Sequence, residues 1–441
     1  MASRTWVLIL RFVFCAVLAL LSVLVTRTKW VDKIAGIKRQ QFDGWFFAIF
    51  AVSHFAMFVV VFLILHQQPW ADLTGAYMPQ AEAAMRGLMP YRDFESAYAP
   101  LNPFLDVVLL RLHHSPLTIL VFQICCEILA VPFWIGFLRR FMKERSVRLA
   151  AVLYLLQPLV MWNICIDGKN QGMICLLLSI ALFTIGRKEI LSGVSYSISI
   201  VAVKFLPIIF FPALFFGSRK RILWSVSALL PIVLVYGAFE LHGVDVLHPV
   251  KLIAPILAPQ NLPFFITAAT GSTLPPLAMD LLRFIPLVSV VLFTVFIQWT
   301  PKGEAARLWE MQLSMLLVFL TLNTFNGKTD TSYFGMFFFV ACSLVAVWLE
   351  RGRQGILFPY LAFTAVSLPV TSFWFGPMKH LEAEAIFPLW TKGDGAALLM
   401  MALQVVLLYS YFGLAYAAVR SLLESRRENA VSAKAAVAAN A

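Results

Sequence analysis

Charged side chains are scarce in this sequence, and negative ones are the scarcest. Only 13% of the 441 residues are charged, with 23 Asp and Glu against 35 Lys and Arg, while 61% are hydrophobic. A soluble globule of this length needs a more polar surface than so few charges can provide. The mean hydropathy of +0.82 points the same way. The composition therefore predicts an all-α, polytopic membrane protein.

Cysteine and histidine are also scarce, and neither occurs at the spacing of a metal site. The six cysteines lie mostly within apolar runs and form no CxxC motif, so we interpret them as small hydrophobic residues. The seven histidines include no HExxH pattern, which argues against a zinc enzyme. We expect no cofactor, although a divalent cation that helps a phosphate to leave remains open.

The excess of positive charge, +12 overall, occurs in short clusters between apolar runs. Such clusters mark the cytoplasmic loops of membrane proteins, and they explain the charge better than nucleic-acid binding does. Placing them inside puts the amino terminus outside. The outer segments are then 67–102, 163–171, 240–276, 326–332 and 376–394.

About 11 apolar runs are long enough to cross a bilayer. We expect spans near residues 6–26, 42–65, 117–138, 149–165, 171–186, 222–240, 280–299, 308–325, 333–349, 355–375 and 395–419. Residues 190–217 have basic flanks on both sides and are too short for two full crossings, so they predict two short helices that meet near Lys204 and Pro207. Counting both short helices gives about 13. One membrane domain thus covers residues 1–420, and an Ala-rich tail, 421–441, is expected to be cytoplasmic and disordered.

The longest polar interruption, residues 67–102, is expected to hold the chemistry. A bilayer does not stabilise such a segment, so it lies in water or at a wet membrane boundary. Pro79 suits the first turn of a helix that ends near Gly87. Asp72 follows the second span, where the membrane lowers the local dielectric and outer solvent supplies substrate. The segment's charged residues are Asp72, Glu82, Arg86, Arg92, Asp93 and Glu95.

Three stretches carry short motifs in order over roughly residues 42–350. They are Asp72, Tyr77, Ala83, Gly87, Pro90-Tyr91, Asp93-Phe94 and Tyr98-Ala99-Pro100-Leu101; then Gly168-Lys169-Asn170-Gln171 with Val203-Lys204-Phe205-Leu206-Pro207; then Asn326-Gly327-Lys328-Thr329-Asp330-Thr331-Ser332-Tyr333-Phe334. Together they resemble the GT-C glycosyltransferases, in particular glycosyltransferase family 87, the polyprenyl-phosphate-mannose-dependent mannosyltransferases. Two features depart from that pattern: Pro79 interrupts a usually smoother helix, and residues 168–171 lack an aspartate that often follows the glycine-glutamine pair.

The resemblance implies a GT-C-like helical bundle with a short catalytic loop on its outer face. It also implies an enzyme, a hexosyltransferase of glycolipid biosynthesis in the cell envelope. Such an enzyme transfers a monosaccharide, with mannose favoured, from a polyprenyl-phosphate donor to a lipid-linked or glycan acceptor. The expected location is a bacterial plasma membrane, with the site on the periplasmic or extracellular side among membrane lipids.

The same resemblance places the candidate general base at Asp72, since the attacking hydroxyl must lose its proton. The departing lipid phosphate needs cations or amide donors aimed at it. The candidate substrate-binding residues are Tyr77, Arg92, Asp93, Glu95, Tyr98, Lys204, Asn326, Lys328, Tyr333 and His380.

Plainer interpretations stay open for several of these residues. Asp72 could be a helix cap or a solvated loop acid. Asp93 and Glu95 share one side of an extended segment, but such a pair is often merely solvated. Lys204, in apolar surroundings, either snorkels to an interface or pairs with an anion. Lys328 could form a surface ion pair of little energetic worth.

A transporter or lipid flippase is the alternative function. Such a protein would share the span count and the basic inner loops. Transporters tend to place ionisable or helix-breaking groups near the midplane, in related positions of two repeated halves. The sequence shows no such repeat, and its acids gather at the outer ends, so the enzyme is favoured.

Overall fold

The computed structural model describes residues 2–27, 30–70, 72–253, 257–300, 302–375 and 381–440. Within these ranges the chain forms helices and no strand, with one isolated bridge between Pro90 and Phe94. The predicted all-α class is therefore confirmed. The helices are α1 Ala2–Arg27, α2 Trp30–Gly36, α3 Arg39–Phe58, η1 Val59–Ile64, η2 Leu73–Tyr77, α4 Met78–Met85, α5 Asn102–Leu112, α6 Pro116–Leu138, α7 Glu144–Leu155, α8 Pro158–Cys165, α9 Gln171–Thr184, α10 Glu189–Val201, η3 Leu206–Phe210, α11 Phe211–Gly217, α12 Arg221–Leu241, α13 His248–Ile253, α14 Leu262–Thr270, α15 Pro276–Gln298, α16 Glu304–Phe325, η4 Thr331–Met336, α17 Phe338–Glu350, η5 Gln354–Ile356, α18 Leu357–Phe375, α19 Ala383–Thr391 and α20 Gly395–Asn440.

Eight helices in the described ranges are long and apolar enough to cross a bilayer. A ninth is present if α7 and α8, which meet at 53°, form one broken span. These helices support an integral membrane protein. The higher count stays a prediction, because α9 and α17 have 14 and 13 residues, about 20 Å each, while the hydrocarbon core is about 30 Å thick.

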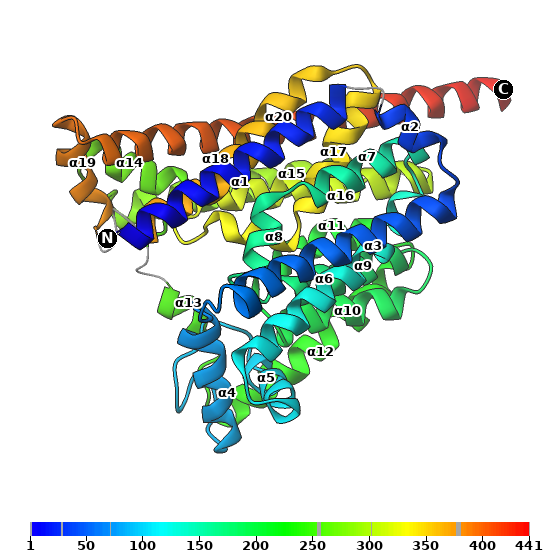
Figure 1. Cartoon of the computed structure of the whole chain (residues 1–441). Helices are drawn as coiled ribbons and strands as arrows, with labels where there is room; N and C mark the ends of the chain where they lie inside the picture. The colour runs from blue at the N-terminus through cyan, green and yellow to red at the C-terminus, as the bar shows by residue number, and fades with distance from the viewer. Residues whose placement is uncertain are drawn as a thin grey trace.

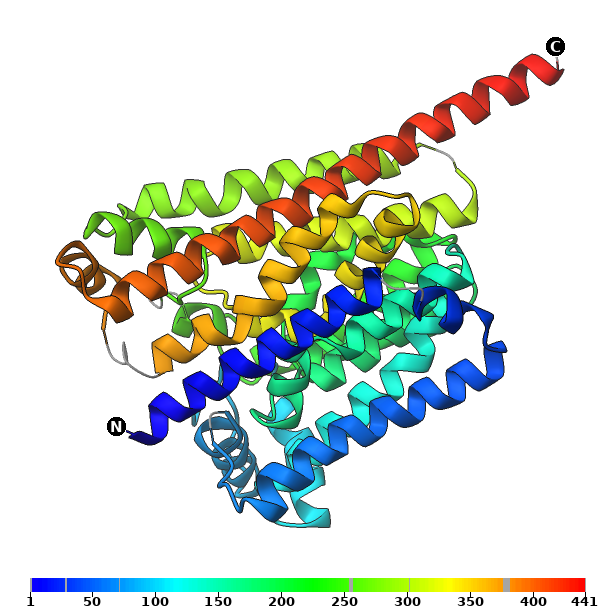
Figure 2. The same cartoon turned by 45° about the horizontal axis from the view of Figure 1, so that its top comes forward.

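The helices at the rim of the bundle differ from those at its centre. α1, α3, α12 and α15 expose apolar side chains along much of their length, including Val52, Val233 and Leu292, whereas most side chains of α16 are buried. Exposed apolar surface on this scale suits contact with lipid. Figure 1 shows α4, α5 and α13 gathered at one end of the bundle and α2 at the other. Figure 2 likewise separates the amino terminus of α1 from the carboxyl terminus of α20.

The two short helices predicted for residues 190–217 are present as α10 and as η3 with α11. Pro207 stands in the first turn of η3, where its missing N–H costs no hydrogen bond. The Tyr196 hydroxyl lies 3.1 Å from the carbonyl oxygens of both Pro207 and Ile208, so it secures the turn. Lys204 lies between the two helices, as predicted.

The polar segment 67–102 folds as η2, α4 and a returning chain. Pro79 lies in the first turn of α4, and Gly87 follows its end with φ +82°, which confirms the predicted helix. The returning chain then reaches the carboxyl end of α10, where Ala99 N–H donates to Val203 O at 3.3 Å and Leu101 N–H donates to Val201 O at 3.1 Å. The segment is thus attached to the turn that carries Lys204.

The carboxyl-terminal segment is helical. Residues 421–440, for which the sequence predicts disorder, continue α20, which runs for 46 residues. Alanine, the residue with the highest helix propensity, is the most frequent residue of this segment. The α20 segment near Ser425 also contacts α16, since the Ser425 hydroxyl donates to Glu310 Oε1 at 2.8 Å.

One polar cluster lies within the apolar core. Nε2 of His54 in α3 lies 3.2 Å from Oε2 of Glu127 in α6, and the hydroxyl of Tyr154 in α7 donates to Glu127 Oε1 at 3.0 Å. All three side chains are buried. Since an uncompensated polar group is costly there, the contacts of Glu127 with His54 and Tyr154 connect α3, α6 and α7.

Candidate functional site

The carboxylate of Asp72 lies at the start of η2, just beyond the span formed by α3 and η1. Its Oδ2 atom is 3.6 Å from Nζ of Lys169, in the turn between α8 and α9. The Asp72 side chain is 33% exposed and that of Lys169 is 19% exposed. Solvent therefore reaches the carboxylate, while the ammonium is largely enclosed.

Lys169 is surrounded by three acids. Burial lowers its pKa, but the carboxylates of Asp72, Asp330 and Asp167 outweigh burial and raise the pKa above its usual value. Lys169 is therefore protonated at every physiological pH. Its positive charge compensates the negative charges of acids from three separate segments of the chain, which are the start of η2, the turn before α9 and the turn before η4.

A second ammonium, that of Lys204, is held by aromatic rings. Its Nζ atom lies 4.2 Å from the centre of the Tyr333 ring and 5.7 Å from that of Tyr98. Rings attract a cation without neutralising it, so the charge of Lys204 still acts on Asp72. The Tyr98 hydroxyl is close enough to the Asp72 carboxylate to lower its pKa, and the Tyr98 ring meets that of Tyr77 edge-on at 4.9 Å.

These neighbours set the protonation of Asp72. Burial raises its pKa, but Lys169, Lys204 and the Tyr98 hydroxyl together lower the pKa below the ordinary value for aspartate. The carboxylate is therefore ionised at neutral pH and can accept a hydrogen bond or a proton. Burial raises the pKa of Tyr98 well above its usual range, so that hydroxyl stays neutral and can donate.

Gly168 brings the two halves of the cluster together. Its φ is +62°, and a Cβ atom at this position would lie 2.4 Å from Cδ1 of Leu73 in η2. Only glycine permits both this backbone conformation and this approach. As a result η2 packs directly on the turn before α9, which sets Asp72 beside Lys169.

A buried hydrogen-bond network lies beneath the cluster. Asn170 N–H donates to the Tyr77 hydroxyl at 3.2 Å, and Asn170 Nδ2 donates to Asn102 Oδ1 at 3.3 Å. Asn102 Nδ2 in turn donates to Asp106 Oδ2 at 3.0 Å. Burial raises the pKa of Asp106 to about 8. The network fixes Tyr77 and the turn that carries Lys169.

Asp167 connects the cluster to α1. Its Oδ1 atom accepts a hydrogen bond from Trp70 Nε1 at 3.0 Å and lies 3.9 Å from a guanidinium nitrogen of Arg11. Burial raises the pKa of Asp167, against the attraction of Arg11 and Lys169. Arg11 also donates to Ser372 in α18 at 2.9 Å, so the amino-terminal helix is held at the site by polar contacts.

Three predicted site residues lie outside this cluster. Arg92 and Asp93 pair with each other at 2.8 Å, and both are exposed. Asp93 also accepts from the Met89 N–H at 2.8 Å. Glu95 is exposed. Within the described ranges, no recorded contact joins any of the three to Asp72 or Lys169.

The fold separates the candidate residues of the third motif, residues 326–334. Tyr333 contacts Lys204, as described, but Lys328 has Arg283 and Asp280 of α15 as its charged neighbours. The Asn326 side chain accepts from Lys328 N–H at 3.3 Å and so forms the turn after α16. His380 lies outside the residues that the structure describes.

The sequence-based candidates omitted Lys169, Asp330 and Asp167 from the site. These charged residues interrupt apolar runs, which is visible in the sequence. No pattern within either segment indicates that the two segments meet in the fold. In the described part of the chain, no group of His, Cys, Asp or Glu has the arrangement of a metal site. The ammonium of Lys169 supplies the positive charge that Asp72, Asp330 and Asp167 would otherwise require from a metal ion.

The arrangement combines an ionised, solvent-accessible carboxylate with two ammonium groups and three tyrosines. It can accept a proton from a hydroxyl and can bind an anion a few ångströms away. Comparison of the chain with models of protein families, with curated proteins and with solved structures found no match in any of the three.

Proposed function

We propose that this protein is an integral membrane glycosyltransferase. It transfers a monosaccharide, with mannose favoured, from a polyprenyl-phosphate donor to a lipid or glycan acceptor on the outer face of a bacterial plasma membrane. The observation that carries the proposal is the convergence of Asp72, Lys169 and Lys204, from three distant segments, at one end of a bundle of apolar helices.

In this proposal Asp72 is the general base. The acceptor hydroxyl gives its proton to the Asp72 carboxylate as its oxygen forms a bond to the anomeric carbon of the donor sugar. The bond from that carbon to the phosphate oxygen breaks, and the electron pair leaves with polyprenyl phosphate. A positioned base of this kind typically accelerates the step by about 10²- to 10⁴-fold.

Lys169 and Lys204 stabilise the phosphate that departs. Lys204 suits this role because the rings of Tyr333 and Tyr98 hold its ammonium without neutralising it. Lys169 is shared between the phosphate and Asp72. When it moves toward the phosphate, the attraction that lowers the pKa of Asp72 weakens, and the carboxylate becomes a stronger base. Donor binding thereby activates the base.

The remaining predicted residues are assigned by position. Tyr77 and Tyr98 form the wall beside Asp72, and Tyr333 holds Lys204. The exposed residues Arg92, Asp93 and Glu95 belong to the solvent side of the loop, where an acceptor approaches. Asn326, Lys328 and His380 are proposed as more distant substrate contacts.

The experiment is incubation of the purified protein with a panel of polyprenyl-phosphate sugars and a lipid extract, followed by mass spectrometry. A product heavier than an extract lipid by one hexose unit, formed only with one member of the panel, is the expected result. If no member of the panel is consumed, the proposed reaction is wrong.

A transporter or lipid flippase is the second candidate, and one observation favours it. The His54–Glu127 pair is buried where α3 and α6 cross the bundle, and ionisable groups inside membrane proteins often line transport routes. Proteoliposomes distinguish the two. A flippase moves lipid-linked sugar between leaflets without changing its mass, whereas the transferase changes the mass of its acceptor.

A further inference from the structure

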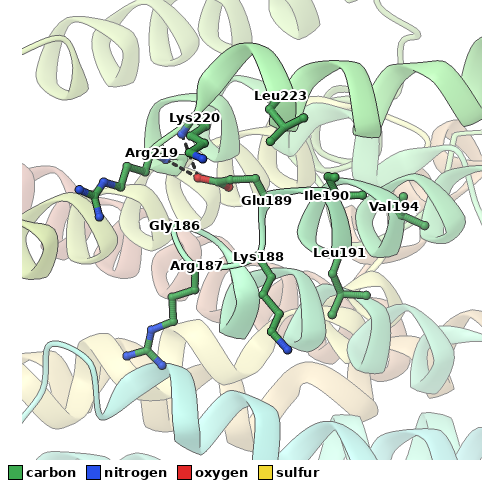
Figure 3. Close-up of a pocket in the computed structure, with 10 residues that line it drawn as sticks. All are labelled: Gly186, Arg187, Lys188, Glu189, Ile190, Leu191, Val194, Arg219, Lys220 and Leu223. Carbon is green, nitrogen blue, oxygen red and sulfur yellow. Dashed lines mark hydrogen bonds between the residues drawn. The ribbon is translucent and has the colours of Figure 1, made fainter.

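A cavity of about 820 Å³ is lined by ten residues around the turn from Gly186 to Leu191 (Figure 3). It lies at the ends of α9 and α10 that are opposite to Lys169 and Lys204. These helices have 14 and 13 residues, which places the cavity about 20 Å from the Asp72 cluster. The lining residues come from two loops and the helix turns that follow them: Gly186, Arg187, Lys188, Glu189, Ile190, Leu191, Val194, Arg219, Lys220 and Leu223. Both loops belong to the basic clusters that mark the cytoplasmic side.

One side of the cavity is strongly basic. Arg187, Lys188, Arg219 and Lys220 are all exposed, and none of them forms an ion pair with another residue in the described ranges. The single acid of the lining, Glu189, is buried, and its Oε1 atom accepts from the backbone N–H groups of Arg219 at 2.7 Å and Lys220 at 3.0 Å. Glu189 therefore ties the two loops together through their backbones. Of the four cations, Arg187 also attracts Glu304, while Lys188, Arg219 and Lys220 face the cavity from the same two loops.

The other side of the cavity is apolar. Ile190, Leu191 and Leu223 are 57%, 45% and 41% exposed, and Val194 completes the wall. Figure 3 shows the basic side chains toward the left of the cavity and these apolar side chains toward the right. Ile190 and Leu191 stand in the first turn of α10 and Leu223 in the first turn of α12. α12 then continues as an apolar helix with exposed Val226 and Leu230. The apolar wall therefore runs into the surface that faces lipid.

We propose that this cavity binds an anionic phospholipid of the inner leaflet. The headgroup phosphate lies among Arg187, Lys188, Arg219 and Lys220, and the upper acyl chains lie along Ile190, Leu191 and Leu223. A free phosphate would use the same cations but would leave the apolar wall in water, which favours the lipid. The volume lies within the usual range of ligand sites. The site is separate from Asp72, so it does not depend on the proposed reaction.

The test is native mass spectrometry of the full-length protein in detergent. The probes are phosphatidylglycerol, phosphatidylcholine with the same acyl chains, and glycerol 3-phosphate. The variants are Arg187→Gln with Lys188→Gln, and Arg219→Gln with Lys220→Gln. The control, Lys33→Gln with Lys38→Gln, removes two charges from exposed positions of the same basic face that do not line the cavity.

We expect the wild type to bind one phosphatidylglycerol in preference to phosphatidylcholine. Each variant pair should weaken phosphatidylglycerol binding by about 30-fold, since a basic residue near an anionic lipid surface contributes roughly a factor of five. The control should bind as the wild type does. Equal loss in the control, or no preference for phosphatidylglycerol, overturns the site. Binding of glycerol 3-phosphate as tight as that of the lipid overturns the choice of lipid over soluble phosphate.

Discussion

Nζ of Lys169 lies 3.6 Å from Oδ2 of Asp72, and this contact joins the loop after the second span to the turn before α9. The two residues belong to motifs that are far apart in the sequence. Their contact sets the charge of the candidate base, because Lys169 is the first of the groups that lower the pKa of Asp72 against burial.

Gly168→Ala should destabilise the fold and disturb the site. The Cβ atom of the alanine would lie 2.4 Å from Cδ1 of Leu73, and the alanine backbone would have to adopt φ +62°. We expect a loss of about 2–4 kcal/mol, since backbone strain and overpacking each cost about 1–3 kcal/mol. Thermal unfolding in detergent measures it.

The matched control for that substitution is Gly87→Ala. Gly87 has φ +82° but nothing within 4 Å of an added Cβ, so it carries the strain without the clash. It should cost about 1 kcal/mol. Leu73→Ala should itself cost about 2–5 kcal/mol because Leu73 is fully buried, but Gly168→Ala should cost less in the Leu73→Ala background than in the wild type. Equal losses at both glycines would contradict the close approach of η2 to the turn.

Lys204→Met should weaken use of the lipid-phosphate donor. The substitution keeps the apolar stem beside Tyr333 and Tyr98 but removes the charge. A hydrogen bond to a charged group contributes about 1.5–3 kcal/mol, so KM for the donor should rise by roughly 10- to 100-fold. Steady-state kinetics with varied donor and fixed acceptor provide the measurement.

Lys328→Met serves as the comparison. The charged neighbours of Lys328 are Arg283 and Asp280 rather than Asp72, so its effect on KM should be several-fold smaller. A larger effect at Lys328 than at Lys204 would move the donor phosphate to the turn after α16.

Asp106→Asn should make the protein more stable at pH 8 and should change its pH dependence. Burial raises the pKa of Asp106 to about 8, above its unfolded value of about 4. The native state therefore holds a proton that the unfolded state releases. The stability linked to Asp106 is fully present below pH 4 and is lost as the pH rises toward 8.

Asparagine can still accept the hydrogen bond from Asn102, but it carries no charge at any pH. The melting temperature of the wild type should therefore fall between pH 5 and pH 8.5 more steeply than that of the variant. Parallel curves for the two proteins would show that Asp106 is not held protonated in the fold.

Glu127→Gln should destabilise the helix bundle. The Glu127 carboxylate accepts a hydrogen bond from the Tyr154 hydroxyl and lies 3.2 Å from His54 Nε2, and all three side chains are buried. A buried polar group that loses its partner costs about 1–3 kcal/mol, and Glu127→Gln changes the partner of both His54 and Tyr154. Tyr154→Phe, which removes one hydrogen bond and little volume, should cost about 1–2 kcal/mol. Thermal unfolding compares them, and equal costs would mean that the His54 contact contributes nothing.

The features that could be predicted from the sequence have local causes. Pro79 and Gly87 delimit α4 because each acts on its own backbone. The short pair α10 and α11 follows from the basic flanks and from Pro207. The segment after residue 420 has too few apolar residues to predict a packed core, but its alanines favour the helix that continues α20.

The site could be predicted only in part, because its members meet through tertiary packing. Asp72, Tyr98, Lys204 and Tyr333 were all candidates, and the fold brings them together. Lys169 was not chosen as a site residue, since its position beside Asp72 depends on the approach of Leu73 to Gly168. No pattern within a single segment reports such a contact.

The activity of Asp72→Asn tests the central claim most directly. The variant keeps the shape of the side chain and loses its ability to take a proton. We expect turnover of the lipid-linked donor to fall by at least about 100-fold, with the protein still folded and donor still bound. Glu82→Gln, at an acid of the same loop whose side chain is 39% exposed and has no assigned role in the site, should retain nearly normal turnover. Near-normal turnover by Asp72→Asn would contradict the assignment of the base and, with it, the proposed chemistry.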